Sequence, residues 1–224
     1  MTPIKIYLAG PDVFFPCDLE TGQKKIDFCK DVGAEGIYPS FLLPKDLFTG
    51  NFSKEEKRII INHQCKSGIR DADIVILNLT PFRGIEMDSG TAFEAGFADA
   101  LGKTIFGYSN IPETYLQRML KVEGTHKDSS NTWRDKNNCV IEDFDLSENC
   151  MIGSSCIDIF VPSNKEQEKL KEDPLYMFKK CIQEAIAKHD LLMQSEIDNA
   201  NTILQNLNKQ DVTESSSLKR ASKM

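Results

Sequence analysis

Residues 71–79 read DADIVILNL, and this stretch decides the fold. Its continuous apolar run predicts a strand that is buried on both faces, as strands are in a parallel sheet. Residues 89–102 (SGTAFEAGFADALG) then show a helical pattern that ends at Gly102, and residues 103–109 (KTIFGYS) predict the next strand. A strand, a helix and a second strand in this order are typical of a parallel α/β domain.

The segments on either side continue the alternation. Residues 4–10 (IKIYLAG) predict a first strand that ends in a glycine turn. The other predicted elements are a helix over 19–33, a short strand or turn at 36–40, a helix over about 54–70 opened by a Ser53–Glu56 capping box, a polar loop at 124–138, a strand within 156–163 and a helical segment over 165–193 broken at Pro174. The predicted fold class is therefore α/β, a flavodoxin- or Rossmann-like three-layer domain with a mostly parallel sheet flanked by helices.

The composition changes after residue 193, which divides the chain into a domain of residues 1–193 and a polar tail of residues 194–224. The tail has no aromatic residue, glycine or proline and is rich in Ser, Asn, Gln and charge. Two interpretations are open: a solvated, disordered tail, or a short interaction helix around Ile203, Leu204 and Leu207.

Several classes of protein are disfavoured by composition. The formal net charge is −7, from 34 Asp and Glu against 27 Lys and Arg, which argues against a nucleic acid polymer as partner. No apolar run reaches the length of about 18 residues that spans a membrane, and the first residues lack a signal-peptide pattern. Seven cysteines without C-x-x-C spacing and three scattered histidines favour reduced thiols and no metal site. We therefore expect a cytoplasmic protein with no metal and no cofactor.

Ligands of parallel sheets bind where the strands end at their carboxyl side. Two loops fall at that edge, Gly10–Pro16 and Pro81–Thr91. Glu94 follows the second loop, one turn into a helix whose other nearby residues are small or apolar. It is either a solvent-facing glutamate that favours the helix start or a partly desolvated carboxylate at the sheet edge, where the positive helix terminus offsets some of the cost.

Asp88 lies six residues before Glu94, in the turn before the same helix. It is either the helix N-cap or a second reactive carboxylate. Two carboxylates beside one cleft suit glycosyl chemistry, in which one attacks the anomeric carbon and the other handles a proton or holds the substrate. Gly96 would allow close approach of a ligand or a backbone.

The sequence resembles the nucleoside 2-deoxyribosyltransferase family over about residues 4–160. The matching pieces are IYLAGPDVF at 6–14, DADIVILNL at 71–79, PFRGIEMDSGTAFEAG at 81–96, ALGK at 100–103 and NCM at 149–151. The long central motif is the specific one. The resemblance implies transfer of a 2-deoxyribosyl group between the nucleobases of 2′-deoxynucleosides in nucleoside salvage, by a retaining, metal-independent mechanism.

The resemblance also assigns roles to individual residues. It implies that Glu94 is the nucleophile and that Tyr7 positions it. It also implies that Asp88 binds the sugar hydroxyls and assists the proton transfer. Gly10 belongs to the substrate-binding loop, and Phe14, or alternatively Phe15, stacks on the base. The family's N-x-M segment comes from a neighbouring subunit, so Asn149 and Met151 would act in trans in a homodimer or a higher homo-oligomer.

Two other functions stay open from the sequence. One is an N-glycosidase that hydrolyses 2′-deoxynucleosides or their 5′-monophosphates, with water in place of the second base. The other is a non-catalytic nucleotide-binding sensor, which would not need Glu94 and Asp88 together. The first loop, PDVFFPCD, is apolar and acidic, which favours an unphosphorylated 5′-OH.

A few positions depart from the family pattern or have open roles. Many relatives carry Asn or Asp where this chain has Cys65, so a contact to the base is missing or comes from Asn62 or Gln64. Some relatives end with a C-terminal carboxylate in the active site, whereas this chain continues about sixty residues past its last predicted strand. Arg83 is expected to bind a phosphate or to tie its loop to Glu86 or Asp88, Cys150 to be a buried structural thiol, and Trp133 to lie at an interface or in a lid.

Overall fold

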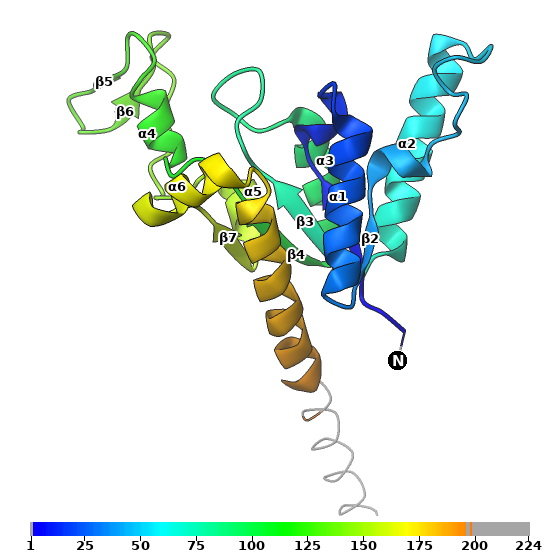
Figure 1. The fold of residues 1–224 in the computed structure, drawn as a ribbon. Coiled ribbons are helices and arrows are strands. Elements are labelled where there is room, and N and C mark those ends of the chain that lie inside the picture. The colour runs from blue at the N-terminus through cyan, green and yellow to red at the C-terminus, as the bar shows by residue number, and fades with distance from the viewer. Residues whose placement is uncertain (1, 196–197, 199–224) are drawn as a thin grey trace, which may run out of the picture. The chain divides into compact units, whose positions relative to one another are not determined.

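The computed structural model describes residues 2–195 and 198, and its centre is a parallel sheet of five strands (Figure 1). The strands run in the order β2-β1-β3-β4-β7, and every neighbouring pair is parallel. Their bounds are β1 Lys5–Ala9, β2 Glu35–Ile37, β3 Ile74–Asn78, β4 Thr104–Tyr108 and β7 Asp158–Phe160. All five residues of the central strand β3 are buried, so the prediction from its apolar run is confirmed.

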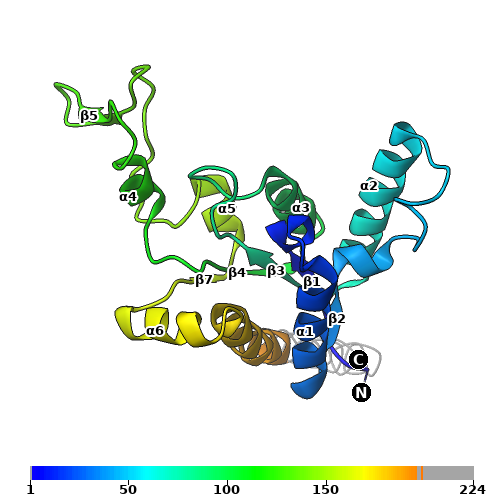
Figure 2. The ribbon, with the colours of Figure 1, turned by 45° about the horizontal axis from the view of Figure 1, so that its top comes forward.

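Helices cover both faces of the sheet, which confirms the three-layer α/β fold class. Figure 2 shows α2, α3 and α5 on one face, and α1 and α6 on the other. The helices are α1 Asp18–Asp31, α2 Lys54–Asp71, α3 Ser89–Ala100, α4 Tyr115–Met119, α5 Cys150–Ser155 and α6 Asn164–Glu172, with 3₁₀ turns η1 Pro11–Phe14 and η2 Pro39–Leu42. Residues 176–185 form a further helical stretch whose Phe178 packs on α1 and β4.

Local sequence signals account for where the main helices begin and end. Ser53 and Glu56 form the predicted reciprocal capping box at the start of α2. Gly33 and Gly102 follow the ends of α1 and α3 with φ of 83° and 65°, values that glycine adopts without strain. Pro174 separates α6 from the helical residues that follow, as predicted.

The predicted loop at residues 124–138 is the element that the sequence misjudged. It contains a small antiparallel hairpin of β5 His126–Lys127 and β6 Trp133–Arg134. Asp128 organises the turn by accepting from the backbone N–H groups of Ser130 and Thr132 and from the Arg134 guanidinium. Polar side-chain bonds rather than apolar alternation build these strands, which is why strand patterning missed them.

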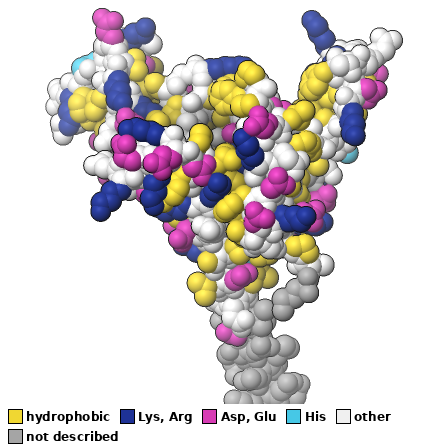
Figure 3. All heavy atoms as spheres, viewed as in Figure 1, with side chains coloured by type: hydrophobic (Ala, Val, Ile, Leu, Met, Phe, Trp, Pro, Cys, Tyr) yellow, Lys and Arg dark blue, Asp and Glu magenta, His cyan; other side chains and the backbone are white. Residues whose placement is uncertain are grey.

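The chain divides by its internal contacts into residues 1–185 and residues 186–224. Residues 186–195 are helical, and this stretch includes the first two residues of the predicted tail, 194 and 195. Ile203, Leu204 and Leu207 lie outside the described residues, and the two interpretations of the tail stay predictions. Among the described helices, none is long and apolar enough to cross a membrane. On the face in Figure 3, basic and acidic side chains of the described residues are interspersed.

Candidate active site

Glu94 lies in the second turn of α3, where it meets Tyr7 of the neighbouring strand β1. The Tyr7 hydroxyl donates to Glu94 Oε1 over 2.6 Å. The Tyr7 side chain is completely buried, and burial raises the pKa of its hydroxyl, so Tyr7 stays a protonated donor. The structure therefore brings together the predicted nucleophile and the residue predicted to position it.

A cavity of about 300 Å³ opens beside the Glu94 carboxylate, between α2 and α3. Asn62 and Cys65 line it from α2, and Gly90 and Phe93 line it from α3. Of the two residues predicted to replace the missing base contact, Asn62 therefore faces this cavity and Gln64 does not. Burial raises the pKa of Cys65 to about 11, so its side chain remains a thiol.

The surroundings of Glu94 favour its protonated form more than water does. Burial raises the pKa of Glu94 to about 7, and the nearby charge of Asp88 acts in the same direction. Hydrogen bonds from Tyr7 and Cys65 oppose this shift. Of the two interpretations of Glu94, the structure therefore supports the partly desolvated carboxylate and not the solvent-facing glutamate.

Asp88 caps α3, as the first of its two interpretations predicted. Its Oδ2 accepts from the Thr91 backbone N–H over 2.9 Å and from the Thr91 hydroxyl over 3.1 Å. Both bonds use one oxygen, so the cap leaves the second oxygen for another partner. The proposed part of Asp88 in proton transfer stays a prediction.

A buried ion pair fixes the first loop, and sequence reasoning missed it. Lys25 is only 2% exposed, and its Nζ donates to Asp12 Oδ2 over 2.7 Å. The Asn78 amide donates to the same oxygen over 3.0 Å. A Cβ on Gly10 would lie 2.7 Å from both the Asn78 Cβ and Asp12 Oδ2, so glycine is needed there for close packing. The helical spacing of Lys25 with buried Gly22 and Cys29 was the available signal.

The two loops predicted at the carboxyl edge meet through aromatic rings. Phe14 stacks on Phe82 with ring centroids 5.4 Å apart, and Phe15 meets the edge of Phe82 at 5.9 Å. Phe14 and Phe15 are both about half exposed, which leaves ring surface for a ligand. The Arg83 guanidinium lies over the rings of Phe14 and Phe82, and among the described residues it forms no ion pair with Glu86 or Asp88, so the second of its two predicted roles is not found.

Asn149 and Met151 lie away from the cavity beside Glu94. Asn149 caps α5, with its Oδ1 accepting from the Met151 backbone N–H and its amide donating to Glu142. The Met151 side chain is 76% exposed. Their assignment to a neighbouring subunit's site stays a prediction. Cys150 is half-buried rather than buried, and burial together with Glu142 raises the pKa of its thiol.

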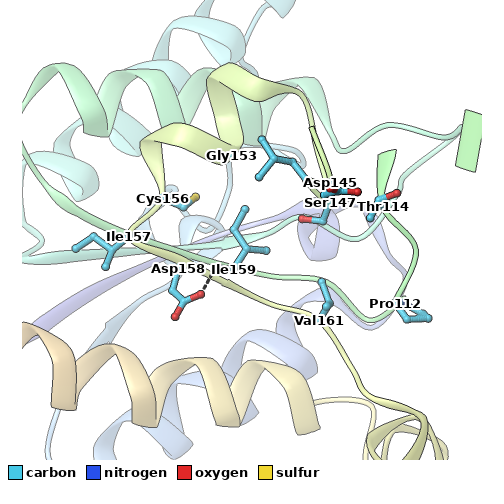
Figure 4. A pocket seen from close by; sticks show the side chains of 11 residues that line it. Pro112, Thr114, Asp145, Ser147, Gly153, Cys156, Ile157, Asp158, Ile159 and Val161 are labelled. Carbon is cyan, nitrogen blue, oxygen red and sulfur yellow. Dashed lines mark hydrogen bonds between the residues drawn. The ribbon is translucent and has the colours of Figure 1, made fainter. Parts of the chain in front are cut away.

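A second cavity of about 310 Å³ lies between β7, α5 and residues 145–147 (Figure 4). None of the predicted site residues lines it. Gly96, predicted to allow a close approach, has nothing within 4 Å of a Cβ built there, so its open side faces no other part of the described chain. Among the described residues, no cluster of three His, Cys, Asp or Glu side chains is placed to hold a metal ion.

Comparison with known proteins gives one matching family model and three similar proteins. The family model for nucleoside 2-deoxyribosyltransferases matches residues 6–151. An uncharacterised protein of Schizosaccharomyces pombe is 31% identical over 121 residues, which are 51% of this chain and 54% of that protein. The structure of a 2-deoxyribosyltransferase from Leishmania mexicana has a TM-score of 0.52 at 26% identity and covers 76% of this chain and 99% of that one. A 2-deoxyribosyltransferase from Bacillus psychrosaccharolyticus has a TM-score of 0.45 at 24% identity, over 73% and 90% of the two chains.

Proposed function

This chain belongs to the nucleoside 2-deoxyribosyltransferase family, and we propose that it transfers the 2-deoxyribosyl group between nucleobases through a covalent intermediate on Glu94. The observation that supports the proposal is the 2.6 Å hydrogen bond from the buried Tyr7 hydroxyl to Glu94 Oε1, at the wall of a cavity. This bond orients the carboxylate that would attack the sugar. The role in nucleoside salvage is part of the same proposal.

The chemistry proceeds in two displacements at C1′ of the sugar. A Glu94 oxygen forms a bond to C1′ while the N-glycosidic bond breaks, and the first base leaves with its bonding electron pair and takes up a proton through Asp88. A nitrogen of the second base then attacks C1′ from the vacated side and gives up its proton through Asp88, while the bond from C1′ to the Glu94 oxygen breaks and the carboxylate departs. Two inversions give net retention. The 2-deoxy sugar lacks the electron-withdrawing 2′-hydroxyl, so positive charge at C1′ develops more easily.

The proposed site is completed by a neighbouring subunit. Asn149 and Met151 are exposed on α5, and an exposed methionine of this kind is suited to an interface. We propose that they reach the sugar site of a second copy, which requires at least a homodimer. Sedimentation of the active protein as a monomer would refute this part.

The experiment follows 2′-deoxyinosine and adenine incubated with the purified protein, with the bases and nucleosides separated by chromatography. We expect deoxyadenosine and free hypoxanthine to appear together. Free hypoxanthine without a new nucleoside would identify a hydrolytic N-glycosidase instead. No reaction with a panel of purine and pyrimidine deoxynucleosides would overturn the enzymatic proposal and favour a nucleotide-binding sensor.

A further inference from the structure

Arg83 and three phenylalanines form a compact group where the two carboxyl-edge loops meet. We call Phe14, Phe15, Phe82 and Arg83 the aromatic–arginine cluster. The guanidinium carbon of Arg83 lies 5.2 Å from the centroid of Phe14 and 4.6 Å from that of Phe82. Because the two ring centroids are 5.4 Å apart, the three groups form a nearly equilateral triangle. The guanidinium therefore lies alongside the gap between the rings rather than beyond one of them.

The cluster leaves the hydrogen-bonding capacity of Arg83 available. Arg83 is exposed, and within residues 2–195 its guanidinium forms no ion pair. Its φ of 56° is a left-handed conformation that an arginine rarely adopts, and the bond from the Phe82 backbone N–H to the Glu86 carbonyl closes the loop around it. The loop thus holds an arginine beside aromatic rings although it gains no ionic contact there.

The cluster is continuous with the proposed reaction site. Phe82, Arg83 and Asp88 line one cavity of about 360 Å³. A Cβ on Gly90 would lie 2.9 Å from Asp88 Oδ2, and Gly90 lines the cavity beside Glu94, so the two cavities adjoin at the start of α3. A base stacked on the half-exposed ring of Phe14, as the family resemblance implies, would lie beside Phe82 and Arg83, which line this cavity.

We propose that Arg83 reads the edge of the nucleobase and makes this chain prefer 6-oxopurines, hypoxanthine and guanine, over adenine. The guanidinium presents two parallel N–H donors, which match the O6 and N7 acceptors of a 6-oxopurine. Adenine offers N7 as an acceptor but an amino group at position 6, so one donor of Arg83 would face another donor. The inference rests on the proposed function, because it names the substrate class of the same site.

A phosphate is the other ligand that a free arginine could bind. Glu86 and Asp88 line the same cavity as Arg83. Two carboxylates this close would repel a phosphate dianion, whereas the neutral edge of a base is not repelled. The acidic surroundings therefore favour the base, and phosphate binding becomes one outcome of the test.

The test measures binding without turnover. Calorimetry on the Glu94→Ala protein compares the dissociation constants of 2′-deoxyinosine, 2′-deoxyadenosine and 2′-deoxyinosine 5′-monophosphate. We expect 2′-deoxyinosine to bind about tenfold more tightly than 2′-deoxyadenosine. Adding Arg83→Gln should reverse the preference, because the glutamine amide pairs with N6 and N7 of adenine. Arg83→Lys, which keeps the charge and loses the paired donors, should abolish the preference without reversing it.

Arg70→Gln is the matched control, since Arg70 also lies over an aromatic ring, that of Phe97, on a different part of the surface. This control should keep the preference for 2′-deoxyinosine. An unchanged ratio in Arg83→Gln would overturn the inference, as would equal binding of both nucleosides to Glu94→Ala. If Arg83→Gln weakened the binding of 2′-deoxyinosine 5′-monophosphate alone, Arg83 would bind phosphate instead. If the wild type fails to transfer while the binding preference follows Arg83, the proposed function fails and the base-reading role stands.

Discussion

Two glutamates of this fold lose most of their contact with water, yet their neighbours differ in kind. Glu94 meets two neutral donors, the Tyr7 hydroxyl and the Cys65 thiol. Glu148 is 3% exposed and meets the guanidinium of buried Arg118. Burial raises the pKa of both carboxyls, and only at Glu148 does a cation oppose it. A negative charge on Glu148 is therefore balanced by the positive charge of Arg118, whereas a negative charge on Glu94 meets only neutral donors.

The partners of Arg118 show what the matched pair does. Its Nε donates to the Ile85 carbonyl over 2.7 Å and its Nη1 to the Glu113 carbonyl over 2.9 Å. The Arg118–Glu148 pair thereby ties the loop after β3 to α4 and to the start of α5. This is structural use of a buried charge, with each of the three guanidinium nitrogens donating to an acceptor.

The difference separates a reactive carboxylate from a structural one. A nucleophile needs an oxygen that is ionised during reaction and that is not already neutralised by a cation. Glu94 meets this requirement at the wall of a cavity, and Glu148 does not. Burial alone would not distinguish the reactive glutamate from the structural one. The distinction depends on whether the partner of the carboxylate is a neutral donor or a cation.

The largest expected effect comes from Glu94→Ala. Loss of the nucleophile should reduce transfer by about 10⁴-fold or more, because no other group forms the covalent intermediate. The measurement is steady-state transfer between 2′-deoxyinosine and adenine, with circular dichroism to verify the fold. Activity similar to that of the wild type would show that Glu94 is not the nucleophile.

Glu94→Gln provides the matched stability control. The folded-state pKa of about 7 exceeds the ordinary value of 4.5, so the folded protein binds the Glu94 proton more tightly than the unfolded chain does. This contribution to stability is complete below about pH 4.5 and is lost as the pH rises through 7. Glutamine keeps an acceptor for Tyr7 and carries no charge, so above pH 7 the variant should be more stable than the wild type by roughly 3 kcal/mol. Near pH 4 the two proteins should unfold alike.

The second effect is one of stability, from Glu148→Ala. This change leaves the Arg118 charge buried without its partner and should lower the free energy of unfolding by about 3–5 kcal/mol. Chemical denaturation at pH 7 measures it. Lys171→Ala breaks an exposed ion pair with Glu168 and should change stability by less than about 1 kcal/mol. A Glu148→Ala protein as stable as this control would refute the structural role of the pair.

The sequence predicted the sheet well because a strand that is buried on both faces is a continuous run of apolar residues. The run of residues 74–77 is apolar throughout, and the capping box of Ser53 and Glu56 marks a helix start by side-chain chemistry alone. Glu94 stood out because its carboxylate interrupts a helix of small and apolar residues. The meeting of Glu94 and Tyr7, 87 positions apart, came from the family resemblance, since no local pattern encodes it.

Other features depend on contacts that no local pattern records. Lys24 and Lys25 are adjacent, but one pairs with exposed Glu20 and the other is buried against Asp12. Only the helical phase distinguishes them. The position of Arg83 depends on how two distant loops meet, and its left-handed backbone has no signature in an arginine. Loop conformation and pairing across the sheet edge therefore limit what the sequence can predict about the site.

The smallest effect is a shift in pH dependence, and it tests the neutral neighbours of Glu94 directly. Because the nucleophile must be ionised, kcat/KM should rise about tenfold per pH unit below 7 and level off above it. Tyr7→Phe removes a hydrogen bond that lowers the Glu94 pKa, so the rise should move to higher pH. Asp88→Asn keeps a capping side chain and removes a charge that raises this pKa, so the rise should move to lower pH even if the rate falls. If the pH at which kcat/KM rises moved in the same direction in both variants, a group other than Glu94 would control it. The contrast between Glu94 and Glu148 would then not explain the reactivity of Glu94.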